Sequence, residues 1–138
     1  MRNLDLNTPV TTSVICIEEW NHTGILLKSD SIYKLEVIPA DQVWYDGHKL
    51  PPFTADGKML PYLALWYPFI RMPFVKWFAL LGCIDKKRST YFKIGTVCDN
   101  YSPEIDGELI CFANDARRFY KHNNEGQMEL TVTKIGSK

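Results

Sequence analysis

Hydrophobic and polar residues alternate in short stretches along the chain. The alternation is clearest in segments 31–38 and 127–133. Their hydrophobic positions are Tyr33, Leu35 and Val37 in the first segment, and Met128, Leu130 and Val132 in the second. A period of two predicts strands with one buried face, so we expect these six side chains to point inward while Lys34 and Glu129 face solvent.

Further β-rich runs are separated by turn signals. The runs are Val14–Glu18, Thr23–Lys28, Trp77–Ile84, Thr90–Val97 and Glu108–Phe112. The turn signals are Asn21-His22, Ser29-Asp30, Asp46-Gly47, Asp56-Gly57, Asp106-Gly107 and Glu125-Gly126. Many short strands with frequent turns predict an all-β fold, an antiparallel sandwich of the jelly-roll type. Trp77–Ile84 is apolar at successive positions, which indicates a central strand covered on both faces, and the one helical turn expected is 115–121.

Composition narrows the class of protein. A chain of 138 residues fits one domain spanning residues 1–138. The 16 basic and 16 acidic residues cancel, which disfavours a nucleic-acid partner because phosphate binding requires a basic surface. The apolar stretch 60–82 is interrupted by Pro61, Pro68 and Pro73, so we expect no membrane span.

The N-terminal segment and the cysteines bear on localisation. No apolar core follows Arg2, as a Sec signal peptide would require. The four cysteines, which are Cys16, Cys83, Cys98 and Cys111, lie far apart in apolar segments without zinc-ligand spacing. Reduced thiols are therefore expected, in a protein that is cytoplasmic or exported without a Sec signal peptide.

The sequence contains no clear pattern of catalytic residues. A nucleophile–base pair would need Cys98 or Cys111 beside one of the histidines, which are His22, His48 and His122, and no local nucleophile motif is present. The carboxylates of Glu18-Glu19, and of Asp46 with Asp56, are explained better by turns. We therefore expect a binding protein and not an enzyme.

The segment 112–126, which connects two predicted strands, contains several oxygen atoms that could coordinate a metal ion. Asp115 and the pair Asn123-Asn124 offer three side-chain oxygens, and a backbone carbonyl near Phe119 adds a fourth. Calcium prefers carboxylate, amide and backbone carbonyl oxygens. The alternative is that these residues only form turns and helix caps.

An ordered set of short motifs resembles the PA-I-type galactophilic lectin family and its relatives with a galactose-binding-like jelly roll. The resemblance covers about residues 23–135. The motifs are Thr23-Gly24-Ile25, Val43-Trp44-Tyr45-Asp46, Ala55-Asp56-Gly57, Phe78-Ala79-Leu80-Leu81-Gly82, Phe92-Lys93-Ile94-Gly95, Asp106-Gly107-Glu108-Leu109, Phe112-Ala113-Asn114-Asp115 and Asn123-Asn124-Glu125-Gly126.

The resemblance implies a calcium ion that bridges protein and sugar. Its side-chain ligands would be Asp115, Asn123 and Asn124, and its backbone carbonyl ligands would come from Phe119 and from Asp46 or Gly47. Hydroxyl groups of galactose or another glycan would complete the coordination.

The chain departs from the lectin pattern at two places. One additional residue precedes the amide pair, so that His122 and Asn123 could instead occupy the amide positions. Histidine is a poor ligand for calcium. The sugar-contacting His and Gln of the family align with Phe53 and Asp56, which puts galactose specificity in doubt, and His48 is the nearby substitute.

Aromatic residues are dense in Leu60–Phe78. They are Tyr62, Trp66, Tyr67, Phe69, Phe74, Trp77 and Phe78. A run this rich predicts exposed rings, which we assign to a homo-oligomer contact anchored by Trp66 and Phe69 in preference to a sugar platform. Two hypotheses follow: a calcium-assisted carbohydrate-binding module, or an assembly module on the same fold that has lost sugar and metal binding.

Overall fold

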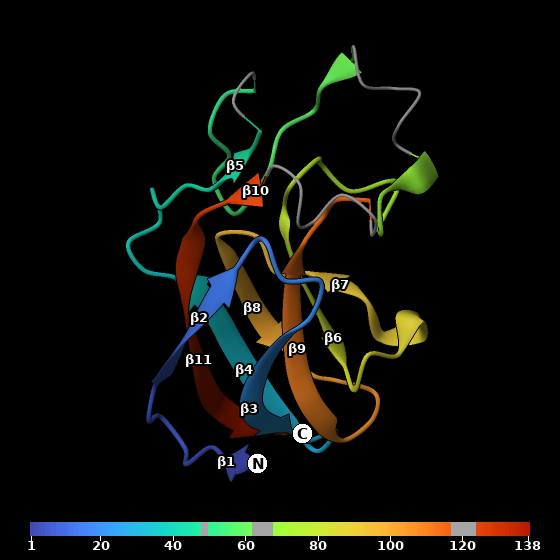
Figure 1. Cartoon of the computed structure of the whole chain (residues 1–138). Coiled ribbons are helices and arrows are strands. Elements are labelled where there is room, and N and C mark those ends of the chain that lie inside the picture. Colours follow the sequence, from blue (N-terminus) through green and yellow to red (C-terminus); the bar gives the residue numbers. More distant parts are fainter. Residues whose placement is uncertain (48–49, 62–67, 117–123) are drawn as a thin grey trace.

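The computed structural model describes residues 1–47, 50–61, 68–116 and 124–138, and its regular secondary structure consists almost entirely of strands (Figure 1). The described residues contain no α-helix, and the 3₁₀ helix η2 spans Arg88–Thr90. The strands are β1 (Arg2–Asn3), β2 (Val10–Ile15), β3 (Asn21–Leu27), β4 (Ser31–Val37), β5 (Tyr45–Asp46), β6 (Leu80–Ile84), β7 (Phe92–Lys93), β8 (Val97–Tyr101), β9 (Gly107–Ala113), β10 (Asn124–Glu125) and β11 (Gln127–Ser137).

Two larger sheets form the body of the fold. One has the order β1-β3-β9-β6-β7 and the other β2-β11-β4-β8, while β10 and β5 form a separate two-stranded sheet. All pairings between these strands are antiparallel except that of β1 with β3. This arrangement confirms the predicted β-sandwich. In the described part of the chain, no helix has the length and apolarity needed to cross a bilayer.

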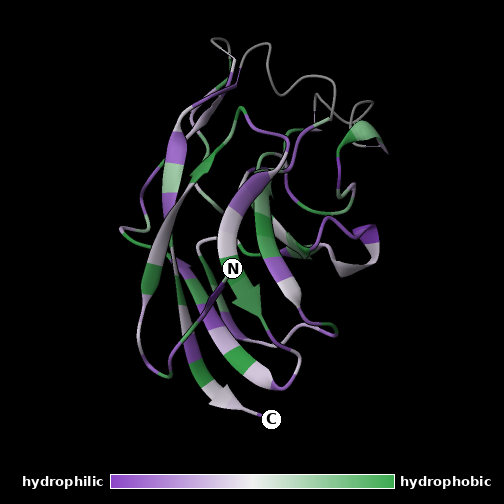
Figure 2. Ribbon diagram, turned by 60° about the horizontal axis from the view of Figure 1, so that its bottom comes forward, coloured by the Kyte–Doolittle hydropathy of each residue, from purple (hydrophilic) through white to green (hydrophobic). Residues whose placement is uncertain are grey.

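The two alternating segments behave as predicted. The six hydrophobic side chains predicted to point inward from β4 and β11 are exposed by 2% or less, and they are Tyr33, Leu35, Val37, Met128, Leu130 and Val132. Lys34 and Glu129, on the other face, are half-exposed. Figure 2 shows the resulting change of hydropathy from residue to residue along the strands. Register is fixed because a one-residue slip would expose all the buried side chains of the strand.

Several strand boundaries differ from the prediction. Strand β2 begins at Val10, four residues before the predicted start, and it ends at Ile15 because the Asn21 side chain hydrogen-bonds both the N–H and the carbonyl of Ile15 at 2.9 Å. The predicted strand Thr90–Val97 is mostly wrong: its strand residues are the two of β7 and Val97, at which β8 begins. Gly95 turns the chain with a positive φ of 64°, and the Asp56 carboxylate accepts hydrogen bonds from the N–H and hydroxyl of Thr96.

Strand β6 is the buried strand that the sequence predicted, although it begins at Leu80 because Phe78 has a positive φ of 61°. All five residues of β6 are buried. Leu80 and Ile84 face the main core between the sheets, whereas Leu81 and Cys83 join a second cluster on the outer face. That cluster is covered by Arg71, whose guanidinium carbon lies 4.0 Å from the ring centroid of Trp20 and 3.4 Å from that of Phe112.

Three aromatic side chains close the core beneath the β5–β10 end. Trp44 and Phe53 exchange two backbone hydrogen bonds, and the Trp44 indole N–H donates to the carbonyl of Phe78 at 3.0 Å. All three residues are fully buried. Phe53, which the sequence alignment placed among ligand-binding residues, therefore packs the core with its ring 5.3 Å from that of Phe78, and it offers no surface to a sugar.

Gly57 should be essential for the turn that leads into this region. Its φ is +71°, and an added Cβ would overlap the Trp77 carbonyl oxygen and lie 2.8 Å from the Ala79 nitrogen. We expect Gly57→Ala to lower the free energy of unfolding by about 3 kcal/mol and the Tm by roughly 10 °C. Gly24→Ala is the matched control, because Gly24 has a φ of +72° with no atom within 4 Å of the added Cβ. Equal losses in thermal melts of the two variants would contradict the proposed close contact.

Candidate cation and ligand site

Three separate segments bring buried oxygen atoms together at one end of the sandwich. Asp46 lies in β5, Asp115 follows β9, and Asn124 lies in β10. Strand β10 pairs with β5 so that Asn124 is opposite Asp46, and both strands lie above the four-stranded sheet in Figure 1. The three side chains are 2–7% exposed. Asp46 and Asn124, which lie nearly 80 residues apart in the sequence, are thus brought together by a ladder of two residue pairs.

The amide of Asn124 has a fixed orientation. Its Nδ2 donates to Asp115 Oδ2 and to the carbonyl of Cys16, both at 3.1 Å. Both contacts need a hydrogen-bond donor, so the amide cannot be reversed. The Asn124 Oδ1 atom is buried, and no group of the described residues donates a hydrogen bond to it. A buried amide oxygen without a donor is costly unless another positive partner satisfies it.

The two carboxylates share a poorly solvated environment. Burial raises the pKa of Asp115 to about 7, and the nearby charge of Asp46 adds to this effect. Burial also raises the pKa of Asp46, although the Trp77 indole N–H donates to its Oδ2 at 2.7 Å and opposes the shift. Two buried carboxylates of like charge favour a proton or a cation between them. The donor set consists of hard oxygens, which fits calcium.

Asn114, the neighbour of Asp115, holds the adjacent loop in place. Its amide nitrogen donates to the carbonyls of Met72, Val75 and Lys76 at 3.1 Å each, and its Oδ1 accepts from the N–H of Met72 at 2.9 Å. Asn114 is fully buried. The loop that it fixes continues into Trp77, the donor to Asp46. Asn114 therefore positions the site without being a ligand.

The other expected site residues are placed differently. Phe119, Asn123, His48 and His122 lie outside the described residues. Asp56 caps the turn at Thr96, an interaction that lowers its pKa through the Thr96 backbone hydrogen bond. Asn124 contacts Asp115, and the register that puts Asn123 and Asn124 at the amide positions stays a prediction. No cluster of three or more His, Cys, Asp or Glu side chains able to hold a metal occurs among the described residues.

The described cysteines and histidine do not form a nucleophile–base pair. All four cysteines are free thiols. Cys111 is fully buried, and burial raises its pKa. His22 instead contacts Glu108, with 3.0 Å between Nδ1 and Oε1, and the His22 side chain is 54% exposed.

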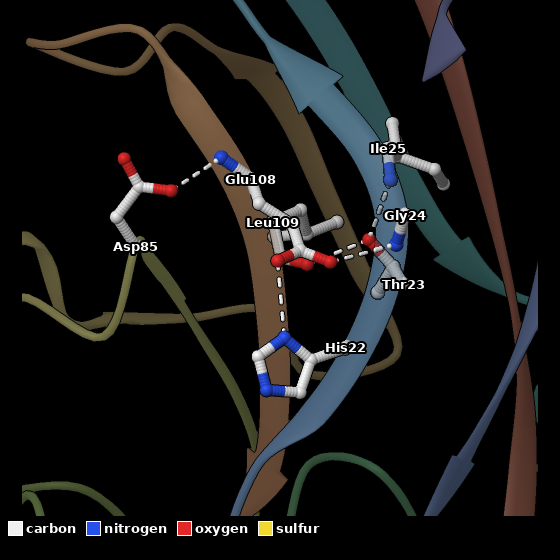
Figure 3. Close-up of polar contacts among 7 residues, drawn as sticks. All are labelled: His22, Thr23, Gly24, Ile25, Asp85, Glu108 and Leu109. Atoms are coloured by element: carbon white, nitrogen blue, oxygen red, sulfur yellow. Dashed lines mark hydrogen bonds and ion pairs between the residues drawn. The ribbon is translucent and has the colours of Figure 1, made fainter. Parts of the chain in front are cut away.

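The contacts around Glu108 have a structural explanation (Figure 3). The ladder of β3 with β9 is irregular between His22 and Leu26. In this interval the N–H of Gly24 donates to the side-chain oxygen Oε2 of Glu108 at 3.0 Å. The backbone N–H of Glu108 donates to Asp85 Oδ1 at 2.8 Å. Burial opposes ionisation of Glu108, but the contacts with His22 and Gly24 outweigh it and hold its pKa below the ordinary value.

The fold is similar to that of a solved structure. The fold is that of a known lectin domain. The N-terminal domain of EclA, described as a PllA-like lectin, superposes with a TM-score of 0.67 at 16% sequence identity, over 90% of this chain and 94% of that domain. No family model and no curated protein matches the sequence. The predicted relationship to lectins is thus supported at the level of the fold, and galactose preference stays a prediction.

Sequence reasoning missed part of the site. Asp46 was expected to contribute only a backbone carbonyl, and its side chain was given no role. Trp77 was assigned to a run of aromatic residues without a polar role. The indole N–H of a buried Trp usually finds an acceptor, which was the available signal. Nothing local in the sequence points to Cys16, whose carbonyl accepts from Asn124 across 108 residues.

Proposed function

We propose that this protein is a non-enzymatic carbohydrate-binding module with a calcium-assisted site. The observation that carries the proposal is the convergence of Asp46, Asp115 and Asn124, whose buried amide oxygen has no hydrogen-bond donor in the described part of the chain. The likeness to a lectin domain supports it at the level of the fold.

Residues of three segments would hold the ion in this proposal. Asp115 and Asn124 would provide side-chain oxygens, as would Asp46 from β5, and Asn123 and the Phe119 carbonyl remain proposed ligands. A calcium ion bound there would supply open coordination positions for glycan hydroxyl groups. This chemistry does not require galactose, and the burial of Phe53 argues for a different glycan.

The test is a glycan array read with calcium and with chelator. We expect glycan binding that requires calcium and that Asp115→Asn reduces by at least tenfold, because a ligand carboxylate is lost from a small oxygen cage. Asp99→Asn, which changes an exposed carboxylate of β8, is the matched control and should bind as the wild type does. Calcium-independent binding, or binding retained in Asp115→Asn, would contradict the proposed site.

A second candidate is an assembly module on the same fold. It is favoured by the use of Phe53 in the core and of Asp56 as a turn cap, since both positions align with sugar-contacting residues of the lectin pattern. An absence of both glycan binding and calcium response would favour this candidate.

A further inference from the structure

Strand β2 is an edge of the four-stranded sheet. Its one ladder partner among the described residues is β11, with a regular register from Val10 opposite Val132 to Ile15 opposite Gln127. The segment Val10–Ile15 contains no charged residue, proline or glycine. Regular, uncharged edge strands can template pairing with another strand.

The backbone groups that face the free side can be assigned from the hydrogen bonds. The Cys16 N–H donates to Gly126 next to β11, whereas the N–H and carbonyl of Ile15 are bonded by the Asn21 side chain on the other side. Successive residues alternate in direction along an antiparallel strand. Thr11 and Ser13 therefore direct their N–H and carbonyl groups to the free edge.

The side chains of these two residues leave the edge open. The hydroxyl of Thr11 lies 3.0 Å from that of Thr131, and Ser13 Oγ donates to Glu129 Oε1 at 2.7 Å. Both contacts draw the side chains back onto β11. Asn21 terminates the edge at Ile15, so the free groups form a short, defined unit.

The other sheet edges are protected. Strands β1 and β7 have two residues each. Strand β8 carries the exposed charge of Asp99, and Asn100 has a positive φ of 55°, which disturbs a regular ladder. Short length, charge and irregularity are the usual means of preventing edge pairing. Among the four edges of the two larger sheets in the described structure, only that of β2 lacks all three.

We propose that a second copy of the protein pairs antiparallel with β2 and joins the two four-stranded sheets. With the two-fold axis at Thr12, Thr11 of each copy lies opposite Ser13 of the other. The two N–H and two carbonyl groups contributed by each copy then form four hydrogen bonds. A second copy fits this edge because the pairing is self-complementary and brings no like charges together within the strand.

The experiment compares Ser13→Pro with Ser13→Ala in sedimentation velocity up to about 100 µM protein, a range that detects weak dimers. Proline removes the outward N–H of residue 13, which takes no part in the β11 ladder, whereas alanine keeps it. We expect dimers for the wild type and Ser13→Ala, and monomers for Ser13→Pro. Circular dichroism and thermal melting establish that each variant is folded.

Hydrogen exchange of the wild type provides a second measurement that does not depend on a variant. The amides of Thr11 and Ser13 should become at least tenfold more protected as concentration rises from monomer to dimer, while the Thr12 amide is protected throughout. Wild-type monomers at about 100 µM, or unchanged exchange at Thr11 and Ser13, would overturn the proposal. A dimer that survives in Ser13→Pro but is lost in Phe74→Ser, which alters a fully exposed ring of the 60–78 segment, would overturn it in favour of that surface.

Discussion

Calcium should raise the Tm of the wild-type protein, and Asp115→Asn should abolish the rise. A ligand that binds only the folded state stabilises it by about 2.7 kcal/mol at 100 times its Kd, which corresponds to roughly 8 °C for a domain of this size. Asn keeps the shape of Asp115 but removes the negative charge that attracts the ion. Differential scanning calorimetry in calcium and in chelator measures both effects.

The metal-free protein offers a second readout of the same site. The pKa of Asp115 is about 7 in the native state and 3.8 in its ordinary environment, so the native state binds more protons between these values. Stability should therefore fall as pH rises from about 4 to 7, by an amount on the order of 3 kcal/mol. Asp115→Asn should flatten this dependence, and the control Asp99→Asn should retain both it and the calcium response. A Tm indifferent to calcium and to chelator would contradict the site.

Replacing Asn114 should produce the largest loss of stability of any single polar substitution that we describe. Asn114→Ala removes four hydrogen bonds to the loop 72–76. The carbonyls of Met72 and Lys76 keep hydrogen bonds from Val75 and Ala79, whereas the part-buried N–H of Met72 and carbonyl of Val75 lose the Asn114 side chain as a partner. We expect a loss of about 4 kcal/mol and a Tm lower by roughly 12 °C. Because this loop leads to Trp77, the calcium-induced rise in Tm should shrink as well.

Gln42→Ala is the matched control for Asn114→Ala. The Gln42 amide also bonds backbone groups, donating to Pro39 and accepting from Glu129, but it lies near the surface where water can replace it. Its loss should cost about 1 kcal/mol. Thermal melts in which both variants lose the same stability would show that Asn114 does not have the role assigned to it.

The local alternation of hydrophobic and polar residues was sufficient to predict strands that have one face in the core and the other in solvent. Segments 31–38 and 127–133 were predicted correctly because each has one buried and one wet face. The segment 90–97 was mispredicted because its shape is decided by Asp56, a residue 40 positions from Thr96 that caps the turn. A short apolar run contains no information about such a distant partner.

The candidate site was predictable only in part for the same reason. Asp115 and Asn124 lie nine residues apart, so their contact could be inferred from a motif. The Trp77 bond to Asp46 spans 31 residues, and it depends on the loop that Asn114 fixes. The burial of Phe53 could not be predicted, because similarity to a lectin motif does not reveal whether a side chain points to the core or to solvent.

The double coverage of β6 limits where this fold can diversify. Its alternate side chains belong to two packed clusters, one inside the sandwich and one beneath Arg71. A substitution at any of its five positions is therefore constrained by packing on one side or the other. Evolution or engineering of ligand preference should therefore act mainly through exposed residues that belong to neither cluster.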